Sequence, residues 1–270
     1  MRLLAELWLF FRRDLAIARS YRAAFLLEGA GTLFGAAMIY YVARLVDSPA
    51  LAQALPQRGS YFAFALVGFA FFDYLGVALD TFDRSLEEAR STGTLEPLLV
   101  TQTSLPVILA GSAIYPFAAT TLRVAVYLIW GGALFGLPLG RANWFGVVVI
   151  LLASVLAFSG LGIFSASYLL LFKRGSPAKW LVLGLSGLAS GMLFPVSILP
   201  GWLQFLARLN PVTYALNAAR SALLAGASLG ELLRPIGILL LFAAILLPAS
   251  MAAFAAALRR TKTTGTLTHT

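Results

Sequence analysis

Long apolar runs separated by short clusters of charged residues dominate this chain. A helix needs about 20 mainly apolar residues to cross the hydrocarbon core of a bilayer, and the charge map leaves room for six such helices. We expect them near residues 23–45, 60–80, 105–136, 144–171, 180–199 and 235–257. The pattern therefore predicts an all-α membrane protein with six transmembrane helices.

Two segments have helical character but do not suit a crossing. Residues 1–22 carry apolar and charged positions at helical spacing, as a helix on a membrane surface does. The region 200–230 is divided into pieces too short to cross. Its breakers are Pro200, Gly201, Asn210 and Pro211. We expect an N-terminal amphipathic interfacial helix and short extracellular re-entrant helices between spans five and six.

The composition supports the membrane class. Hydrophobic residues make up 60% of the chain and charged residues 11%, and the mean hydropathy is +0.87, outside the range of soluble domains. The chain has no cysteine, which excludes disulfides and thiol chemistry, and its one histidine is His269 in a Thr-rich tail. We expect one transmembrane permease domain over 1–260 and a disordered cytoplasmic tail over 261–270.

The basic residues indicate topology. The net charge is +9, yet the Lys and Arg residues gather at the ends of apolar runs instead of forming one patch with interleaved aromatics, so nucleic acid is not an expected partner. Cytoplasmic loops retain positive charge. The distribution predicts both termini in the cytoplasm, with the loops 81–104 and 172–179 on the same side, for a multi-pass protein of the cell's inner (plasma) membrane.

The largest polar feature on that side is DRSLEEARSTGTLEPLLVTQTSLP, residues 83–106. A short helix, a turn at Gly93 and a second helix fit this sequence. From the residues alone, it is either a docking element for a cytoplasmic partner or a solvated loop whose charges keep it out of lipid.

Two separated motifs resemble a known family. They are GTLEPLLVTQTS and, about a hundred residues later, FPVSILPGWLQFLARLNPVTYALNAARSAL. Together they look like the type-two permeases of ATP-binding-cassette (ABC) exporters, and nearer to the drug-exporter branch; the resemblance covers nearly the whole chain. It implies that the first motif lies beside a cytoplasmic coupling helix between spans two and three, which contacts a nucleotide-binding subunit. The second motif would form the re-entrant helices.

The resemblance assigns the partner-docking residues of the coupling region. These are Glu87, Glu88, Arg90, Gly93, Thr94, Leu95 and Glu96. Gly93 also suits a turn that needs positive φ, and Glu96 suits a helix N-terminus. The implied partners are two copies of the nucleotide-binding subunit, a second permease subunit as a homodimer, and the lipid bilayer.

The sequence has no G-x-x-x-x-G-K-[ST] loop and no catalytic motif. We therefore expect no enzyme activity, catalytic residue, cofactor or metal on this chain, and ATP and Mg on the partner subunit. The predicted function is export of an amphipathic, drug-like or lipid-linked substrate.

Four charges fall within or beside predicted spans, where charge is costly and often functional. They are Glu28, Asp73, Asp80 and Arg123. A structural ion pair is one interpretation, and Glu28 at the interface is another. The alternative function is an ion-coupled secondary transporter that uses Glu28, Asp73 and Arg123, although the inverted repeats typical of that class are not visible. A third class, a membrane scaffold or intramembrane enzyme, lacks a catalytic constellation.

Two further sets of residues are candidates. Phe69, Phe72 and Ser190 could line a substrate path, although the aromatic cluster at 61–74 also suits helix packing. Pro195 and Pro200 should kink or end span five, either as a gate or as a passive kink.

Overall fold

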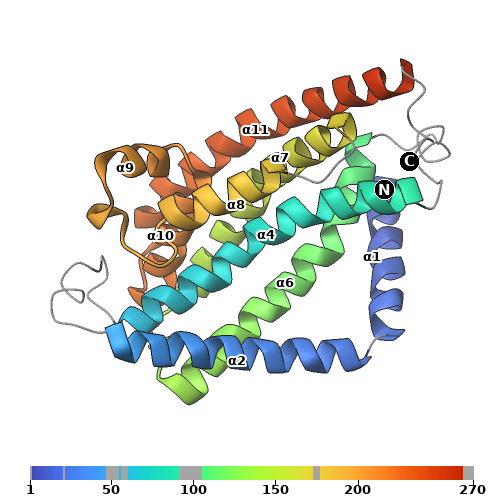
Figure 1. Ribbon diagram of the computed structural model, residues 1–270. Helices are drawn as coiled ribbons and strands as arrows, with labels where there is room; N and C mark the ends of the chain where they lie inside the picture. The colour runs from blue at the N-terminus through green and yellow to red at the C-terminus, as the bar shows by residue number, and fades with distance from the viewer. Residues whose placement is uncertain are drawn as a thin grey trace.

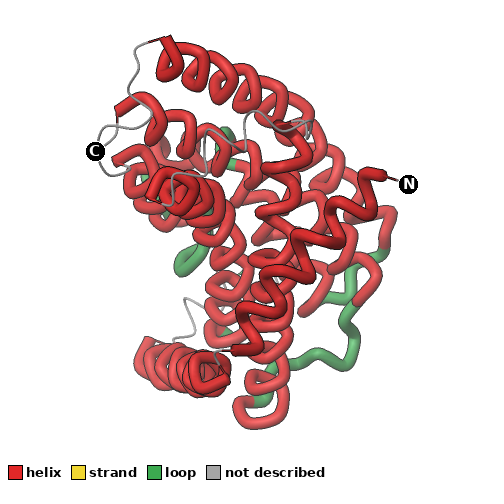
Figure 2. The backbone as a smooth tube through the Cα atoms, turned by 90° about the vertical axis from the view of Figure 1, so that its right-hand side faces the viewer, coloured by secondary structure: helices red, strands yellow, loops and turns green. Residues whose placement is uncertain are grey.

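The computed structural model describes residues 2–20, 22–46, 55, 60–91, 105–172 and 177–263. Within these ranges the regular structure is entirely helical, as Figure 2 shows. The helices are α1 Arg2–Ser20, α2 Arg22–Val46, α4 Tyr61–Ser91, α6 Leu105–Phe135, α7 Trp144–Phe172, α8 Pro177–Ala189, the 3-10 turn η1 Val196–Ile198, α9 Gly201–Arg208, α10 Pro211–Leu224 and α11 Leu229–Thr263.

Helix α4 holds the centre of the bundle and contacts α2, α6, α7, α8 and α10. In Figure 1, the axes of α4, α6, α7 and α11 are roughly aligned with one another, and α2 lies at the edge of the bundle against α4 and α6. We name the two ends of the bundle by the ends of α4. At the Tyr61 end, the Tyr40 ring of α2 contacts Phe62 and Phe135 at 5.4 and 4.9 Å between centroids. At the Ser91 end, Leu86 clusters with residues of α7 and α11.

Among the helices that the structure describes, five are long and apolar enough to cross a membrane: α2, α4, α6, α7 and α11. They correspond to five of the six predicted spans. The remaining one, predicted over 180–199, is not a single long helix, because α8 has 13 residues and ends at Ala189. The chain turns at Gly191, whose φ of +81° favours glycine. The count of six crossings stays a prediction.

The coupling region differs from the expected arrangement. Instead of a separate short helix that begins near residue 83, α4 continues without a break to Ser91 and has 31 residues. The reason is that Phe82 and Leu86 still face the bundle and are buried, and no glycine or proline occurs between Gly76 and Gly93. Residues 92–104 lie outside the described part of the chain.

The two short helices of the 200–230 region are confirmed as α9 and α10. Their boundary is set by Asn210, whose side chain accepts a hydrogen bond from the Val212 amide while Pro211 occupies the first helical position. Asn210 also donates to the Ser186 hydroxyl of α8 at 2.9 Å. The far end of α10 reaches the Tyr61 end, where the Asn143 amide donates to the Ala222 carbonyl at 2.9 Å.

Helices form at both ends of the described chain, as α1 and α11. Helix α1 crosses α6, with Phe11 against Tyr115, and leaves Trp8 and Leu9 exposed, which suits the predicted interfacial position. Helix α11 continues to Thr263 instead of ending before a tail at 261. Thr261 is buried and its hydroxyl donates to the Ala257 carbonyl, which stabilises this last turn.

Candidate functional site

The described part of the predicted docking surface lies on the last turns of α4. Glu87 and Glu88 are exposed there, so a protein that approaches the Ser91 end meets two carboxylates. The backbone of Arg90 belongs to α4, but its side chain lies outside the described set. The others, Gly93, Thr94, Leu95 and Glu96, also lie outside the described residues.

An ion pair joins α4 and α6 near the middle of both helices. Arg123 Nη1 lies 2.7 Å from Asp73 Oδ2, and each side chain is about one quarter exposed, at 26% and 28%. The structure therefore brings together two of the predicted intramembrane charges. Glu28 lies in α2, and its side chain is outside what the structure describes.

A second set of polar contacts ties the Ser91 end of α4 to its neighbours. Asp80 forms a salt bridge with Lys179 at the start of α8 and lies 3.6 Å from Arg84, one turn further along α4. Asp83 is buried and accepts a hydrogen bond from Ser165 of α7 at 3.2 Å. Any displacement of this end of α4 would therefore strain its contacts with α7 and α8.

The predicted path residues have different surroundings. Phe69 packs edge-on against Tyr127 of α6, at 6.2 Å between ring centroids. Phe72 lies beside Gly187 of α8, and Ser190 is fully buried just after α8 ends. These contacts describe packing within one chain, and a role in a path stays a prediction.

The predicted kink residues stand at helix starts. Pro195 caps η1 and Pro200 caps α9, both in extended conformations. The chain has already left the helix at Ala189, so the turn at Gly191 precedes both prolines. The interruption of α8 and the two proline caps together produce the bent segment 190–200.

The sequence analysis missed Arg220 of α10, which is completely buried. Its Nε donates to the Phe64 carbonyl of α4 at 3.1 Å, and its Nη2 donates to the Met192 carbonyl of the bent segment at 2.9 Å. The guanidinium also lies 3.5 Å from the centroid of the Phe64 ring, within cation–π distance. Among the described residues, no acidic side chain pairs with it.

A signal for Arg220 is present in the sequence. One arginine stands in the otherwise small and apolar run ALNAARSALLAG. Its neighbours Ala218, Ala219 and Ala222 are all buried, so α10 can approach α4 closely. A charge among small residues on a helix too short to span indicates a buried polar contact, but the sequence does not identify the partner.

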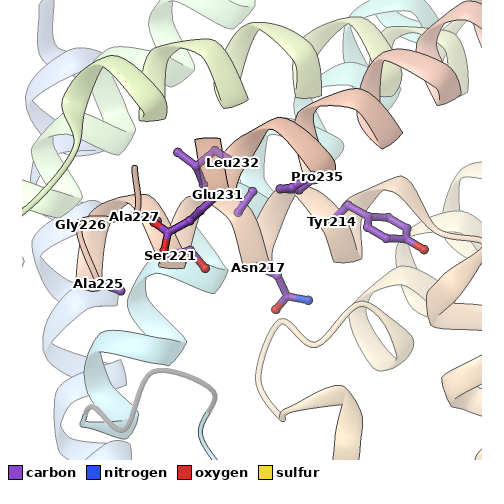
Figure 3. Close-up of a pocket in the computed structure, with 10 residues that line it drawn as sticks. Tyr214, Asn217, Ser221, Ala225, Gly226, Ala227, Glu231, Leu232 and Pro235 are labelled. Carbon is purple, nitrogen blue, oxygen red and sulfur yellow. The ribbon is translucent and has the colours of Figure 1, made fainter. Parts of the chain in front are cut away.

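A pocket of about 470 Å³ opens between α10 and the start of α11. Figure 3 shows Ser221 and Glu231 at one side of it and Tyr214 at the other. Glu231 also accepts hydrogen bonds from the Ser228 amide and hydroxyl at 2.7 and 2.9 Å, a capping arrangement that starts α11. The lining mixes hydroxyl, amide and carboxylate groups with alanine, leucine and proline, which suits an amphipathic molecule.

Comparison with known proteins agrees with this architecture. Residues 5–224 match the family described as "ABC-2 type transporter". The chain is also similar to the "Linearmycin resistance permease protein LnrN" of Bacillus subtilis (strain 168), with 29% identity over 174 residues. That alignment covers 63% of this chain and 43% of the relative, so the chain spans less than half the length of the curated relative that it matches. Because the family match covers most of a chain with five long apolar helices, the protein belongs to the ABC-2 type transporter family as a multi-pass membrane permease.

Proposed function

We propose that this permease is the membrane subunit of an ABC exporter, which moves an amphipathic, drug-like or lipid-linked compound out of the cytoplasm or inner leaflet. The energy comes from ATP hydrolysed, with Mg, by a separate nucleotide-binding subunit present in two copies. The family match is the observation that carries the proposal. Export is favoured because the relative is named for resistance. The mixed polar and apolar lining of the pocket between α10 and α11 supports an amphipathic substrate.

The exposed end of α4 is the proposed docking point. Glu87 and Glu88, on the last turns of α4, offer two charges to a basic surface on the partner. The positive charges of the neighbouring segments predict that this end of α4 lies in the cytoplasm with both termini. Arg90, Gly93, Thr94, Leu95 and Glu96 complete this surface in the proposal. A movement of α4 caused by the bound partner would be transmitted to α8 through the Asp80–Lys179 salt bridge.

The second permease subunit is proposed to be another copy of this chain. One face of α8 is exposed and apolar. It includes Trp180, Leu181, Leu185 and Leu188. Phe72 and Ser190 lie beside this helix, so movement of α8 against a second copy could open the predicted path.

Co-purification with the ATP-binding subunit tests this function. The variant E87K/E88K should lose binding of the subunit and the ATPase stimulation that follows from it, because two attractive charges become repulsive. The matched control R141E/R234E reverses two exposed charges at the Tyr61 end and should retain binding.

Both variants should reach the membrane in similar amounts, because all four side chains are exposed. Retention of normal binding and ATPase by E87K/E88K would contradict docking at α4. Transport driven by an ion gradient in the absence of any ATPase would instead support the secondary-transporter alternative.

A further inference from the structure

Helix α8 has few ways to hold its position in the bundle. It is short, one face is exposed, and its backbone ends in the bent segment 190–200 instead of continuing as helix. The carbonyl groups at the end of a helix have no partner within that helix, and in a lipid environment each must find one elsewhere. The contacts made by this end of α8 therefore decide where it lies.

Arg220 contacts the bent segment at Met192, three residues after the last residue of α8. One guanidinium reaches the Met192 carbonyl of the bent segment and the Phe64 carbonyl of α4. Hydrogen bonds from a charged donor are about twice as strong as neutral ones, and the planar fork of arginine suits two acceptors in fixed positions. A single side chain of α10 thus joins the end of α8 to the centre of the bundle.

The neighbouring helix is shaped for this contact. Gly68 faces both Arg220 Nη2 and the Met192 carbonyl, and a Cβ atom at this position would overlap both of them. Any other residue at 68 would therefore separate the bent segment from α4. The close approach depends on glycine in α4 as much as on arginine in α10.

The opposite end of α8 is also tied to α4. Lys179 forms a salt bridge with Asp80 there, so α8 is attached near both of its ends to the helix that carries the proposed docking surface. We propose that Arg220 is a positioning residue for transport, which latches the bent end of α8 against α4 and must rearrange when α8 moves. The role of Arg220 in transport rests on the proposed function. The latch itself, which consists of the hydrogen bonds from Arg220 to the Phe64 and Met192 carbonyls, is a property of the isolated chain.

The absence of cysteine in the sequence permits a direct test. Ser190 is fully buried beside the latch and its hydroxyl lacks a hydrogen-bond partner among the described residues, so S190C should be tolerated and should react slowly with a water-soluble maleimide. The protein would be purified in lipid nanodiscs, where the reagent reaches both faces. In S190C/R220K the reaction should be at least about tenfold faster, because lysine cannot keep both hydrogen bonds and local opening increases.

The control is S190C/R208K, which makes the same change at an exposed arginine of α9 and should leave the rate unchanged. Equal maleimide rates in S190C, S190C/R220K and S190C/R208K would overturn the latch. If S190C/R220K does not accumulate as folded protein, S190C/G68A decides the question, since it keeps Arg220 but displaces it. Fast labelling of that variant supports the proposal, and slow labelling overturns it.

A second readout concerns transport in the complex. The R220K permease should still bind the ATP-binding subunit, because Glu87 and Glu88 are unchanged, but should move less substrate for each ATP hydrolysed than R208K does. An unchanged ratio would overturn the role in transport. Failure of the unmodified permease to bind the subunit would instead count against the proposed function and would leave the labelling result intact.

Discussion

Asp73 of α4 and Arg123 of α6 are paired across the interface of the two helices, with 2.7 Å between Oδ2 and Nη1. Removal of one partner leaves a charge without its counterion, at a cost of about 3–5 kcal/mol for fully buried pairs. Because both side chains are partly exposed, we expect D73N or R123Q to cost roughly 1–3 kcal/mol. Thermal unfolding in detergent measures this.

The same pair tests the ion-coupling alternative. The double variant D73N/R123Q removes both charges and should recover much of the stability lost by either single variant, since no charge remains unpaired. ATP-driven export should persist in it if the pair is structural. Loss of export in a stable D73N/R123Q protein would instead favour a functional charge site.

Gly162 of α7 predicts a steric effect, because a Cβ atom there would overlap the Ala78 carbonyl of α4. We expect G162A to lower stability by about 1–3 kcal/mol through overpacking. The control G184A places the same methyl group on α8, where a Cβ has nothing within 4 Å, and should be neutral or slightly stabilising. Equal unfolding temperatures for the two variants would contradict the observed contact between α4 and α7.

The Lys179–Asp80 salt bridge predicts a coupling effect. K179E should place two acids together and reduce export, while binding of the ATP-binding subunit to α4 is retained. The charge-swapped variant D80K/K179D should restore a substantial part of the export, although Arg84 beside residue 80 disfavours a lysine there. Export per ATP in proteoliposomes measures the effect, and full activity in K179E would exclude this contact from the transmission of movement.

Asn210 performs two functions that substitutions can separate. N210A removes the cap of α10 and the hydrogen bond to Ser186, whereas N210D keeps the cap and loses only the donor. We expect N210A to cost about 1 kcal/mol more than N210D, in line with the loss of a helix cap. Unfolding free energies of N210A, N210D and S186A give the comparison. Equal costs for N210A and N210D would show that the cap is unimportant here.

The sequence predicted the parts of the fold that follow from length and polarity. The uncharged run at 144–171 became α7 almost residue for residue, and the breakers Asn210 and Pro211 separated α9 from α10. The end of α8 was harder to predict, because Pro195 and Pro200 indicated an end of span five several residues after the helix stops at Ala189. Its position depends on positive φ at Gly191 and on a contact with Arg220, which is distant in sequence.

The candidate site also contains residues whose location could be predicted from the sequence and one, Arg220, whose location could not. Glu87 and Glu88 could be placed on an exposed surface from the charge pattern alone, since charged residues beyond an apolar span have few other locations. Arg220 could not be placed, because its partners are two backbone carbonyls rather than an acid. A buried arginine that binds carbonyl groups leaves no complementary charge in the sequence to indicate its contact.

The unbroken course of α4 has a mechanical consequence. At 31 residues it is about 46 Å long, which exceeds the roughly 30 Å hydrocarbon thickness of a bilayer. A stiff rod of this length acts as a lever: a tilt of about 5° around its midpoint shifts each tip by about 2 Å, in opposite directions. A sideways displacement of one end of α4 on one side of the membrane would thus move its other end, on the opposite side, in the opposite direction.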